Sequence, residues 1–496
     1  MPNSPKASKN QELRMLGRID LDNYIKNTLQ PVDSLSRFKI LQMKVSYFGK
    51  SAITVNFGDA DNKDHRYFSL FIGMNGVGKS TLLREIIDFF IDSQYGKSRK
   101  TEGQQVRIIS LKYAIEGHVY QIEKDEKNVF SCRCDMKRTA KPKYPLIIAS
   151  TMGMFDKFPL NSQNPLRRKG RYDVSFYKYV GPKANNNMFT SKSNVMLQML
   201  SVIGGIKRKA QLSKIGDILK FIGYIPSISL NYTLKENALE ILQNKQKYLD
   251  EETISYLKDM ANAQRQIYTY QIKPQTDTIT YVKNLHLREL NLLRQEGFLQ
   301  SFKCTLNRNN NEIDCNQVSS GEFNMLSILM SVVLSAGNQN LLVLLDEPEI
   351  SQHPNWQMSI IDKLDEALSE YACHFLIASH CHFLVSNLPQ DRSNVFDIEY
   401  NQSGDIEINS LESETYGWSA EQVLLDVFKV GTDRNRYLAS IVGKLLEDIG
   451  QNKISPENLD GRLRFLLKVQ ENLSNVDPLK EIITLICKEF AHEPVR

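Results

Sequence analysis

The stretch that decides the fold is Gly73-Met-Asn-Gly-Val-Gly-Lys-Ser-Thr81, which fits the pattern G-x-x-x-x-G-K-[ST]. It follows an apolar segment that predicts a strand, Tyr67–Ile72. From Lys79 to about Asp92, apolar residues then recur with the period of a helix. A glycine-rich loop between a strand and a helix can turn its backbone N–H groups toward a phosphate at the helix N-terminus. The sequence therefore predicts a phosphate-binding loop rather than an ordinary glycine turn.

The side chains of this loop have distinct expected roles. Lys79 is expected to neutralise charge on the β- and γ-phosphates, and the Ser80 hydroxyl is expected to bind Mg²⁺. The predicted ligands are therefore ATP and Mg²⁺. The residues expected to contact the nucleotide are Gly73, Asn75, Gly76, Val77, Gly78, Lys79, Ser80 and Thr81.

A second apolar strand is predicted to end in two carboxylates. Leu341-Leu-Val-Leu-Leu345 is followed at once by Asp346 and Glu347, and ligands bind at the carboxyl ends of strands in an α/β sheet. Asp346 is expected to share Mg²⁺ with Ser80. Glu347 is expected to be the catalytic residue that polarises a water in line with the γ-phosphate. Two surface acids after a core strand are the plainer alternative.

The segment Val318-Ser-Ser-Gly-Glu322 distinguishes between classes of phosphate-loop protein. It opens a predicted helix and resembles the signature motif of ABC-type ATPases, usually written LSGGQ. In that family the motif closes over the γ-phosphate held by the opposite subunit. The resemblance implies that Ser319, Ser320, Gly321 and Glu322 contact the nucleotide. Ser319 and Glu322 also fit a capping box at a helix start, and the two interpretations are compatible.

A further strand is predicted to end in Ser379-His380, 34 residues beyond Asp346. This resembles the switch histidine of ABC-type ATPases, which implies that His380 hydrogen-bonds the γ-phosphate or the attacking water. His382 is the rival residue, but its apolar neighbours predict that it begins the next helix. The segment Glu349-Ile-Ser-Gln-His-Pro354 resembles the D-loop of SMC, RecF and OLD-type proteins. One departure is that the stretch 150–158 has no glutamine where the family places its lid glutamine.

The motifs occur in the order found in ABC-type ATPases of the SMC, RecF and OLD branch. Two further groups of residues are similar to stand-alone AAA ATPases of bacterial anti-phage defence systems, of the PtuA-like and retron-associated kinds. These groups are Phe155–Phe158 with Tyr177–Lys183, and Tyr416–Trp418 with Val427-Phe428. The resemblance implies a homodimer or higher homo-oligomer that closes around ATP and controls an effector on another chain.

The expected fold class is α/β: a P-loop ABC-type ATPase head with a mixed sheet and flanking helices, a helical insertion and a helical C-terminal segment. Five parts are predicted. They are an N-terminal lead-in at 1–35, a first ATPase lobe at 36–152, a mostly helical basic insertion at 153–300, a second ATPase lobe at 301–413 and a helical segment at 414–496.

Composition excludes several classes of protein. The 496 residues are 41% apolar and 24% charged, which is the balance of a globular chain. There is no apolar run long enough for a membrane helix and no signal-like N-terminus, so a soluble cytoplasmic protein is expected. The seven cysteines form no C-x-x-C pair, which argues against a disulfide scaffold and a structural zinc site.

The net charge of +5 is unevenly distributed. Residues 154–230 contain 13 Lys and Arg against three acids, whereas residues 401–496 contain 16 acids against 11 bases. The basic and aromatic stretch Arg167–Tyr179, with Lys207-Arg-Lys209, is typical of a surface that contacts a phosphate backbone. Nucleic acid at residues 154–230 is therefore a hypothesis, and a solvated loop beside core aromatics is its alternative.

These features predict an ATPase that dimerises around ATP and regulates a partner effector, expected to be a nuclease in anti-phage defence. The residues after Ser413 contain no D-x-D carboxylate pair, so any nuclease is expected on another chain. The main alternative is a RecF- or SMC-like DNA-repair ATPase acting as an ATP-gated DNA clamp. The nucleotide-binding subunit of a transporter is the least favoured, because the insertion is large and no membrane segment is present.

Overall fold

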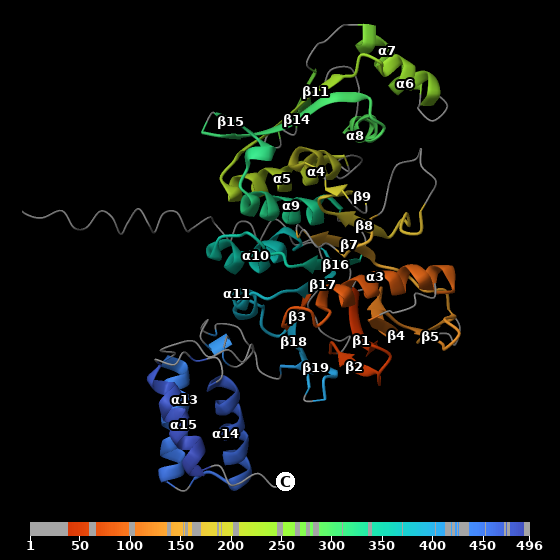
Figure 1. Cartoon of the computed structure of the whole chain (residues 1–496). Helices are drawn as coiled ribbons and strands as arrows, with labels where there is room; N and C mark the ends of the chain where they lie inside the picture. Colours follow the sequence, from red (N-terminus) through yellow and green to blue (C-terminus); the bar gives the residue numbers. More distant parts are fainter. Residues whose placement is uncertain are drawn as a thin grey trace, which may run out of the picture.

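Two sheets and the helices packed on them form the central part of the chain, with an insertion at one end and a helical bundle at the other (Figure 1). This is a computed structural model. It describes residues 38–58, 66–98, 105–135, 140–151, 153, 157–160, 170–185, 188–189, 191–201, 208–245, 251–262, 268–273, 278–280, 287–309, 311–335, 340–369, 371–401, 403–411, 418, 422–423, 425, 436–451, 453–470, 473 and 477–490.

A seven-stranded mixed sheet presents several of the predicted motifs at the ends of its strands. Its strand order is β19-β18-β3-β17-β16-β7-β8, and neighbours run parallel except β18 and β19. Every residue of β7, β16 and β17 is buried, as expected for parallel strands covered on both faces. The strands are β3 (Arg66–Gly73), β7 (Leu146–Thr151), β8 (Tyr177–Val180), β16 (Leu341–Asp346), β17 (Cys373–Ala378), β18 (Ser393–Tyr400) and β19 (Ile406–Ser410).

Helix α3 (Lys79–Tyr95) packs between this sheet and an antiparallel one. The second sheet has the order β2-β1-β4-β5-β6. The helix is buried along most of its length because both sheets contribute to one apolar core with it. The strands of the second sheet are β1 (Phe38–Tyr47), β2 (Ile53–Asn56), β4 (Val106–Ile115), β5 (His118–Lys124) and β6 (Phe130–Cys134).

Helices cover the other face of the mixed sheet and share the largest apolar core with it. The most apolar is α9 (Ser320–Ser335), in which nearly every residue after the first turn is buried. The others are α4 (Lys192–Leu200), α5 (Arg208–Ile222), α10 (Pro354–Ala367) and α11 (His382–Ser386). Helix α11 begins at His382, as the sequence predicts.

The insertion contains a five-stranded antiparallel sheet of order β13-β12-β11-β14-β15, which the sequence did not predict as a sheet. Strands β11 and β14 pair over most of their lengths, so the predicted boundary at residue 300 cuts through this sheet. Its strands are β11 (Ile225–Leu234), β12 (Tyr268–Lys273), β13 (Thr278–Thr280), β14 (Leu299–Arg308) and β15 (Asn311–Asp314). Beside it lie α6 (Ala238–Lys245), α7 (Glu251–Asn262) and α8 (Leu287–Gln295), and β9 (Lys183–Asn185) pairs separately with β10 (Met188–Phe189).

The C-terminal part is a bundle of α13 (Arg436–Gly450), α14 (Pro456–Gln470) and α15 (Pro478–Phe490). It has an apolar core of its own, built from residues such as Leu445, Leu466 and Ile483. Figure 1 shows the bundle beyond the β18–β19 end of the mixed sheet. An ion pair joins Lys468 of α14 to Glu399 of β18 at 3.5 Å.

The α/β fold class is confirmed, with its mixed sheet, flanking helices and helical C-terminal segment. All seven cysteines are free, which agrees with the expectation of no disulfide scaffold. Within the described residues, no helix is both long enough and apolar enough to cross a membrane.

Candidate active site

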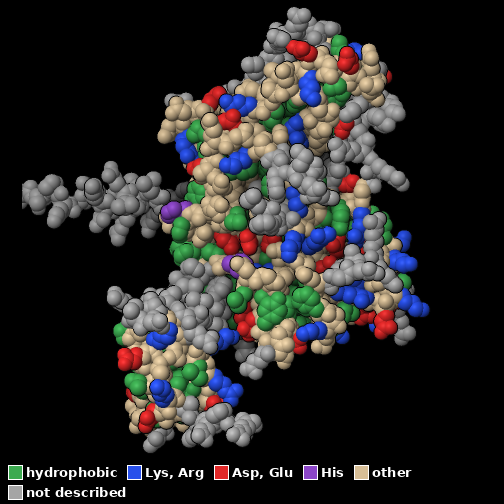
Figure 2. Space-filling view, in the orientation of Figure 1, with side chains coloured by type: hydrophobic (Ala, Val, Ile, Leu, Met, Phe, Trp, Pro, Cys, Tyr) green, Lys and Arg blue, Asp and Glu red, His purple; other side chains and the backbone are tan. Residues whose placement is uncertain are grey.

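The ends of three adjacent parallel strands bring the predicted motifs together. In the strand order β3-β17-β16, β3 leads into the glycine-rich loop, β17 leads to His380, and β16 ends at Asp346. Acidic, basic and histidine side chains adjoin across the middle of the visible face, at the level of β16, β17 and α3 (Figure 2). This is the sheet edge at which α/β proteins bind ligands.

Two glycines allow the loop to take its shape. Gly73 has a φ of 141°, and a Cβ atom there would lie 2.2 Å from the carbonyl oxygen of Ile398 on the neighbouring strand β18. Gly78 has a φ of 95° and stands at the N-cap of α3. Only glycine adopts such backbone angles without strain and admits so close a backbone approach. The predicted loop therefore begins and ends on residues that the fold requires to be glycine.

Lys79 lies buried at the start of α3 with its ammonium group turned back into the loop. Its Nζ donates to the carbonyl oxygens of Gly73 at 2.8 Å and Met74 at 3.0 Å, and lies 3.4 Å from Nδ1 of His380. Burial lowers the pKa of Lys79 to about 8, against the opposing effect of the carboxylates of Glu347 and Asp346. A desolvated ammonium of this kind is strongly attracted to phosphate oxygens.

Ser80 and Asp346 meet as the sequence predicts. The Ser80 hydroxyl donates to Oδ1 of Asp346 at 2.9 Å, although the residues are 266 positions apart. One hydroxyl and one carboxylate oxygen are the hard oxygen ligands that Mg²⁺ prefers, and Mg²⁺ usually takes its remaining ligands from phosphates and water. The residues present therefore fit the predicted Mg²⁺.

His380 lies between Lys79 and Glu347. Its Nδ1 faces the Lys79 ammonium at 3.4 Å, and its Nε2 lies 3.7 Å from Oε1 of Glu347. Burial and the charge of Lys79 lower the pKa of His380 to about 4. The ring is therefore neutral at pH 7, although a backbone hydrogen bond with Gly73 acts in the opposite direction on its pKa. Its Nδ1 faces an ammonium group and its Nε2 faces a carboxylate. Both predicted catalytic residues thus lie beside the phosphate-binding loop.

Glu347 has a strained backbone. Its φ is 48°, in the left-handed region that non-glycine residues rarely adopt. Its N–H donates to the carbonyl oxygen of Ala378 at 2.8 Å, which continues the β16–β17 pairing by one bond. The chain turns sharply after this bond and leaves the Glu347 side chain partly exposed next to His380. Such strain is retained where the surrounding structure fixes it, commonly at functional sites.

A third carboxylate, that of Glu349, holds the backbone of His380. Sequence reasoning assigned Glu349 only to the D-loop. Oε1 of the buried Glu349 accepts from the Ser379 hydroxyl at 2.5 Å and from the His380 N–H at 3.2 Å. Its Oε2 is buried without a hydrogen-bond partner among the described residues. Burial raises the pKa of Glu349 to about 7. In the sequence, only its place directly after Glu347-Pro348 indicated that Glu349 lies near the site.

The signature segment adopts the capping geometry. Ser319 precedes the first residue of α9; its hydroxyl accepts from the Glu322 N–H at 3.2 Å and donates to Oε2 of Glu322 at 3.0 Å. Arg308 of β14 donates to Oε1 of Glu322 at 2.7 Å and lies over the ring of Tyr224 at 4.1 Å. Although partial burial opposes it, these hydrogen bonds lower the pKa of Glu322. The insertion sheet is thereby tied to the signature segment, a link that the sequence did not reveal.

Gly321 and Asn324 join α9 to residues 347–352, which overlap the predicted D-loop at 349–354 and are called the D-loop segment below. A Cβ atom on Gly321 would lie 2.3 Å from the carbonyl oxygen of Ser351. Nδ2 of Asn324 donates to the carbonyl oxygens of Pro348 at 3.1 Å and Ile350 at 2.8 Å. The signature helix and the segment that begins at Glu347 are therefore in direct backbone contact.

The remaining predicted contact residues occupy the loop and the start of its helix. Val77 is buried, Asn75 and Gly76 are exposed, and Ser320 begins α9. Thr81 accepts a hydrogen bond at 2.9 Å from Nζ of Lys157, which belongs to the stretch where the lid glutamine is missing. Of that stretch, residues 152 and 154–156 lie outside the described residues.

The basic stretch is partly used inside the fold. Arg171 forms ion pairs with Asp88 and Asp92 of α3, and the Tyr172 hydroxyl donates to Asp88 at 2.9 Å. Tyr177 and Tyr179 are buried in the core. The residues Arg167, Arg168, Lys169 and Lys207 lie outside the described residues, as do Tyr416 and Gly417 of the second anti-phage resemblance. Contact with nucleic acid stays a prediction.

Comparison with known proteins gives one family match. Residues 183–385, less than half of the chain, match the model described as AAA ATPase domain. The matched stretch includes the signature segment, both carboxylates and His380, whereas the glycine-rich loop precedes it. No curated protein matches the chain.

Solved structures similar to the chain include SMC heads and ATP-binding cassettes. An SMC head bound to the C-winged helix domain of ScpA has a TM-score of 0.36 at 11% identity, over 75% of this chain and 98% of that one. The SMC head domain of Thermotoga maritima has a TM-score of 0.31 at 9% identity, over 76% and 100%. An ATP-binding cassette of an ABC transporter, in its ADP conformation, has a TM-score of 0.28 at 14% identity, over 79% and 96%.

Residues 183–385 are therefore similar to an AAA ATPase domain, and the glycine-rich loop lies before this stretch in the chain.

Proposed function

We propose that the chain binds ATP with Mg²⁺ and hydrolyses it to ADP and phosphate. The observation that carries this proposal is the meeting of the two predicted motifs at Ser80 and Asp346, 2.9 Å apart, beside the row Lys79, His380 and Glu347. A phosphate-binding lysine, a pair of Mg²⁺ ligands and a residue that orients or deprotonates the attacking water are parts that recur in phosphoryl transfer, and the neutral histidine adds a hydrogen-bonding group beside them.

In ATP binding, Lys79 exchanges its contacts with two carbonyl oxygens and His380 for phosphate oxygens. The loop N–H groups and the N-terminus of α3 provide the remaining donors for the phosphates. Ser80 and Asp346 would hold Mg²⁺, which would neutralise phosphate charge when bound. Lys157, which donates to Thr81 at the loop, is placed to add a cation where the family has its lid glutamine.

In hydrolysis, Glu347 accepts a proton from a water molecule as the water oxygen attacks the γ-phosphorus. The bond between the γ-phosphorus and the bridging oxygen breaks, and ADP keeps that oxygen with its electron pair. His380 donates its Nε2 proton as a hydrogen bond to a γ-phosphate oxygen or holds the attacking water. A general base and an oriented donor each contribute substantially to such a step.

Two chains would assemble head to tail, so that Ser319 of one chain meets the γ-phosphate bound by Lys79 of the other. Ser319 is exposed, and its hydroxyl is already oriented by Glu322 at the start of α9. A hydroxyl and free backbone N–H groups at a helix start form a site for an anion. Dimer closure and completion of the site would then be one event, and hydrolysis would reopen the dimer.

The proposed role of this cycle is to control a partner effector, a nuclease in anti-phage defence. The short resemblances at Tyr177–Lys183 and Tyr416–Trp418 support this role. The alternative, an ATP-gated DNA clamp of RecF or SMC type, is supported by the basic composition of residues 154–230. Purification of the tagged chain from its native host separates the two: a nuclease that copurifies supports the first, and duplex DNA without one supports the second.

Replacing the proposed base tests the enzymatic part. Glu347→Gln keeps the shape of the side chain but cannot accept the proton, so ATP binding should persist while turnover falls by about 10²–10⁴-fold. The variant should accumulate an ATP-bound dimer, measurable by light scattering after gel filtration. Glu312→Gln, on the exposed strand β15, is the matched control and should behave as wild type. Wild-type turnover in Glu347→Gln would refute Glu347 as the base.

A further inference from the structure

A cluster of three potential metal ligands lies away from the proposed ATPase site, at the edge of the antiparallel sheet. Strand β6 is the edge strand, and Tyr120 of β5 is paired with Cys134 of β6. His118 lies two residues before Tyr120 and therefore projects from the same face of the sheet. His118 and Cys134 are thus diagonal neighbours on one face, close enough for long side chains to meet.

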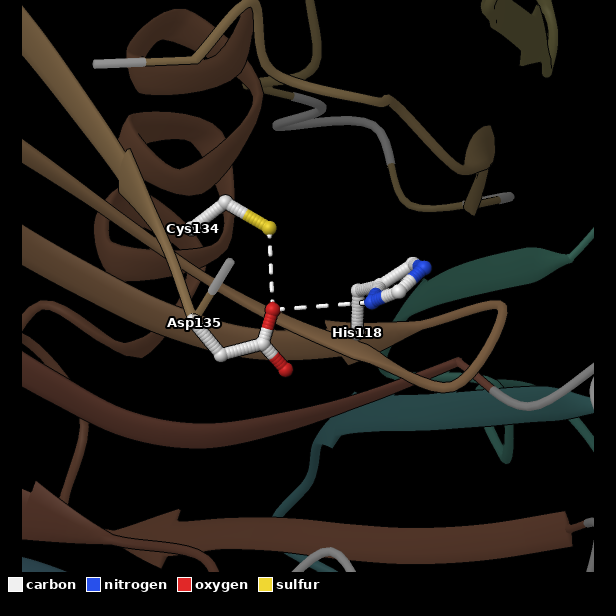
Figure 3. A group of neighbouring side chains, drawn as sticks. All are labelled: His118, Cys134 and Asp135. Carbon is white, nitrogen blue, oxygen red and sulfur yellow. Dashed lines mark hydrogen bonds and ion pairs between the residues drawn. The ribbon is translucent and has the colours of Figure 1, made fainter. Parts of the chain in front are cut away.

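Asp135 completes the cluster directly after β6. Its N–H donates to the carbonyl oxygen of Val119 at 3.1 Å, and its Oδ2 accepts from the Val119 N–H at 3.2 Å. These two bonds fix the carboxylate so that Oδ1 lies 3.0 Å from Sγ of Cys134 and 3.5 Å from Nδ1 of His118 (Figure 3). One ligand atom from each residue lies within 4.8 Å of the others.

We propose that His118 Nδ1, Cys134 Sγ and the Asp135 carboxylate bind a Zn²⁺ ion at this edge, with water completing the coordination. Nitrogen, sulfur and carboxylate oxygen are the ligand types of zinc, whereas Mg²⁺ and Ca²⁺ prefer oxygen alone. The Val119 N–H holds the carboxylate, as outer hydrogen bonds commonly do around metal ligands.

The cluster is accessible without opening the core. The His118 and Asp135 side chains are 38% and 42% exposed, so Zn²⁺ can reach them from solvent. The three side chains come from two paired strands and the residue after one of them, and their ligand atoms lie within 4.8 Å of one another. Bound Zn²⁺ would cross-link β5 to the edge strand β6, and the Cys134 thiol would release its proton.

The nearby Cys132 provides a matched control. It lies two residues before Cys134 on the same face of β6, and its Sγ contacts the carbonyl oxygen of Arg133. Cys132→Ser and Cys134→Ser therefore remove the same group from neighbouring positions, and only the second should affect the metal.

The test uses the full chain, freed of metal by a chelator and titrated with Co²⁺ without ATP or Mg²⁺. Wild type and Cys132→Ser should bind one equivalent and show a thiolate-to-cobalt charge-transfer band in the near ultraviolet, which Zn²⁺ abolishes. Cys134→Ser should lose the band. In competition with a coloured chelator, Cys134→Ser and His118→Ala should bind Zn²⁺ at least about tenfold more weakly than wild type.

Other results would overturn the proposal. A wild-type chain that binds no stoichiometric Co²⁺ would show that the three side chains form a hydrogen-bonded cluster only. An unchanged band in Cys134→Ser, or loss of the band in Cys132→Ser, would assign the metal to other ligands. Far-ultraviolet circular dichroism of each variant must match wild type, and Asp135→Asn, which keeps an acceptor for the Val119 N–H, tests the same assignment if another variant misfolds.

Discussion

Replacing Gly321 by alanine should separate the signature helix from the D-loop segment. The new Cβ atom would lie 2.3 Å from the carbonyl oxygen of Ser351 and 3.2 Å from Cα of Gln352. Because carbon atoms pack at about 3.5–4.0 Å, the two backbones must move apart by about 1 Å. Both neighbours are backbone atoms, so no side-chain rotation relieves the contact.

The size of the effect follows from two opposing contributions. Overpacking of this kind costs about 1–3 kcal/mol, and the movement also stretches the hydrogen bonds from Asn324 to Pro348 and Ile350. Alanine favours a helix over glycine by at most about 1 kcal/mol. We therefore expect Gly321→Ala to destabilise the fold by about 1–2 kcal/mol. Turnover should fall more than ATP affinity, because the phosphate-binding loop is untouched.

Tryptophan fluorescence is the appropriate assay. Both tryptophans of the chain, Trp356 and Trp418, pack against the core that contains α9, whereas the C-terminal bundle has its own core. The urea midpoint followed by tryptophan emission should therefore fall in Gly321→Ala. Gly443→Ala is the control: this helical glycine of α13 has open space around its Cβ position, so alanine should stabilise the bundle and leave the tryptophan midpoint unchanged.

The reasoning fails if Gly321→Ala keeps the wild-type midpoint and the wild-type turnover. That result would mean that the backbone contact between α9 and the D-loop segment is absent in solution. A lowered midpoint with unchanged turnover would show that the contact exists in solution but does not affect hydrolysis.

Two further predictions concern the proposed site shared by two chains, in which Ser319 of one chain faces Lys79 of the other, and the buried carboxylate of Glu349. Ser319→Arg and Lys79→Ala should each be inactive alone, whereas their mixture should regain turnover at one of two sites; no rescue in demonstrated mixed dimers would exclude the head-to-tail arrangement. Glu349→Gln should keep the acceptor for Ser379 and His380 but remove a pH dependence of the free energy of unfolding. The folded-state pKa of Glu349 is raised from 4.5 to about 7, so wild-type stability should fall as pH rises through that window, and the variant should lack this fall. Urea midpoints of both proteins at about pH 5 and about pH 8 measure this fall. If the midpoint changes equally with pH in wild type and Glu349→Gln, Glu349 is not the source of the pH dependence.

Sequence reasoning located the site where the chemistry depends on consecutive residues. A glycine-rich loop before a helix and carboxylates after an apolar strand are local patterns, and the structure places Ser80 against Asp346 as predicted. The capping arrangement of Ser319 and Glu322 is also local, three residues apart, and is present. Local sequence specifies such features because the strand or helix that presents each side chain is itself a local structure.

Contacts that depend on the order of the strands or on distant partners were predictable only through the resemblance, or not at all. The placement of His380 between Lys79 and Glu347 follows from β17 lying between β3 and β16, an order that no local pattern specifies. Likewise, Arg171 was expected on a surface that binds polyanions, but it pairs with Asp88 and Asp92 of α3. A charged residue in a basic stretch carries no sign of a partner almost 80 positions earlier.

The strain at Glu347 connects the two halves of the site. A glutamate held at a φ of 48° can keep this conformation only if the residues after it are fixed. They are fixed by Asn324, which binds the carbonyl oxygens of Pro348 and Ile350, and by the contact of Gly321 with Ser351. Gly321 lies two residues after Ser319, so the segment proposed to meet the phosphate of a second chain is also in contact with the residues that support Glu347.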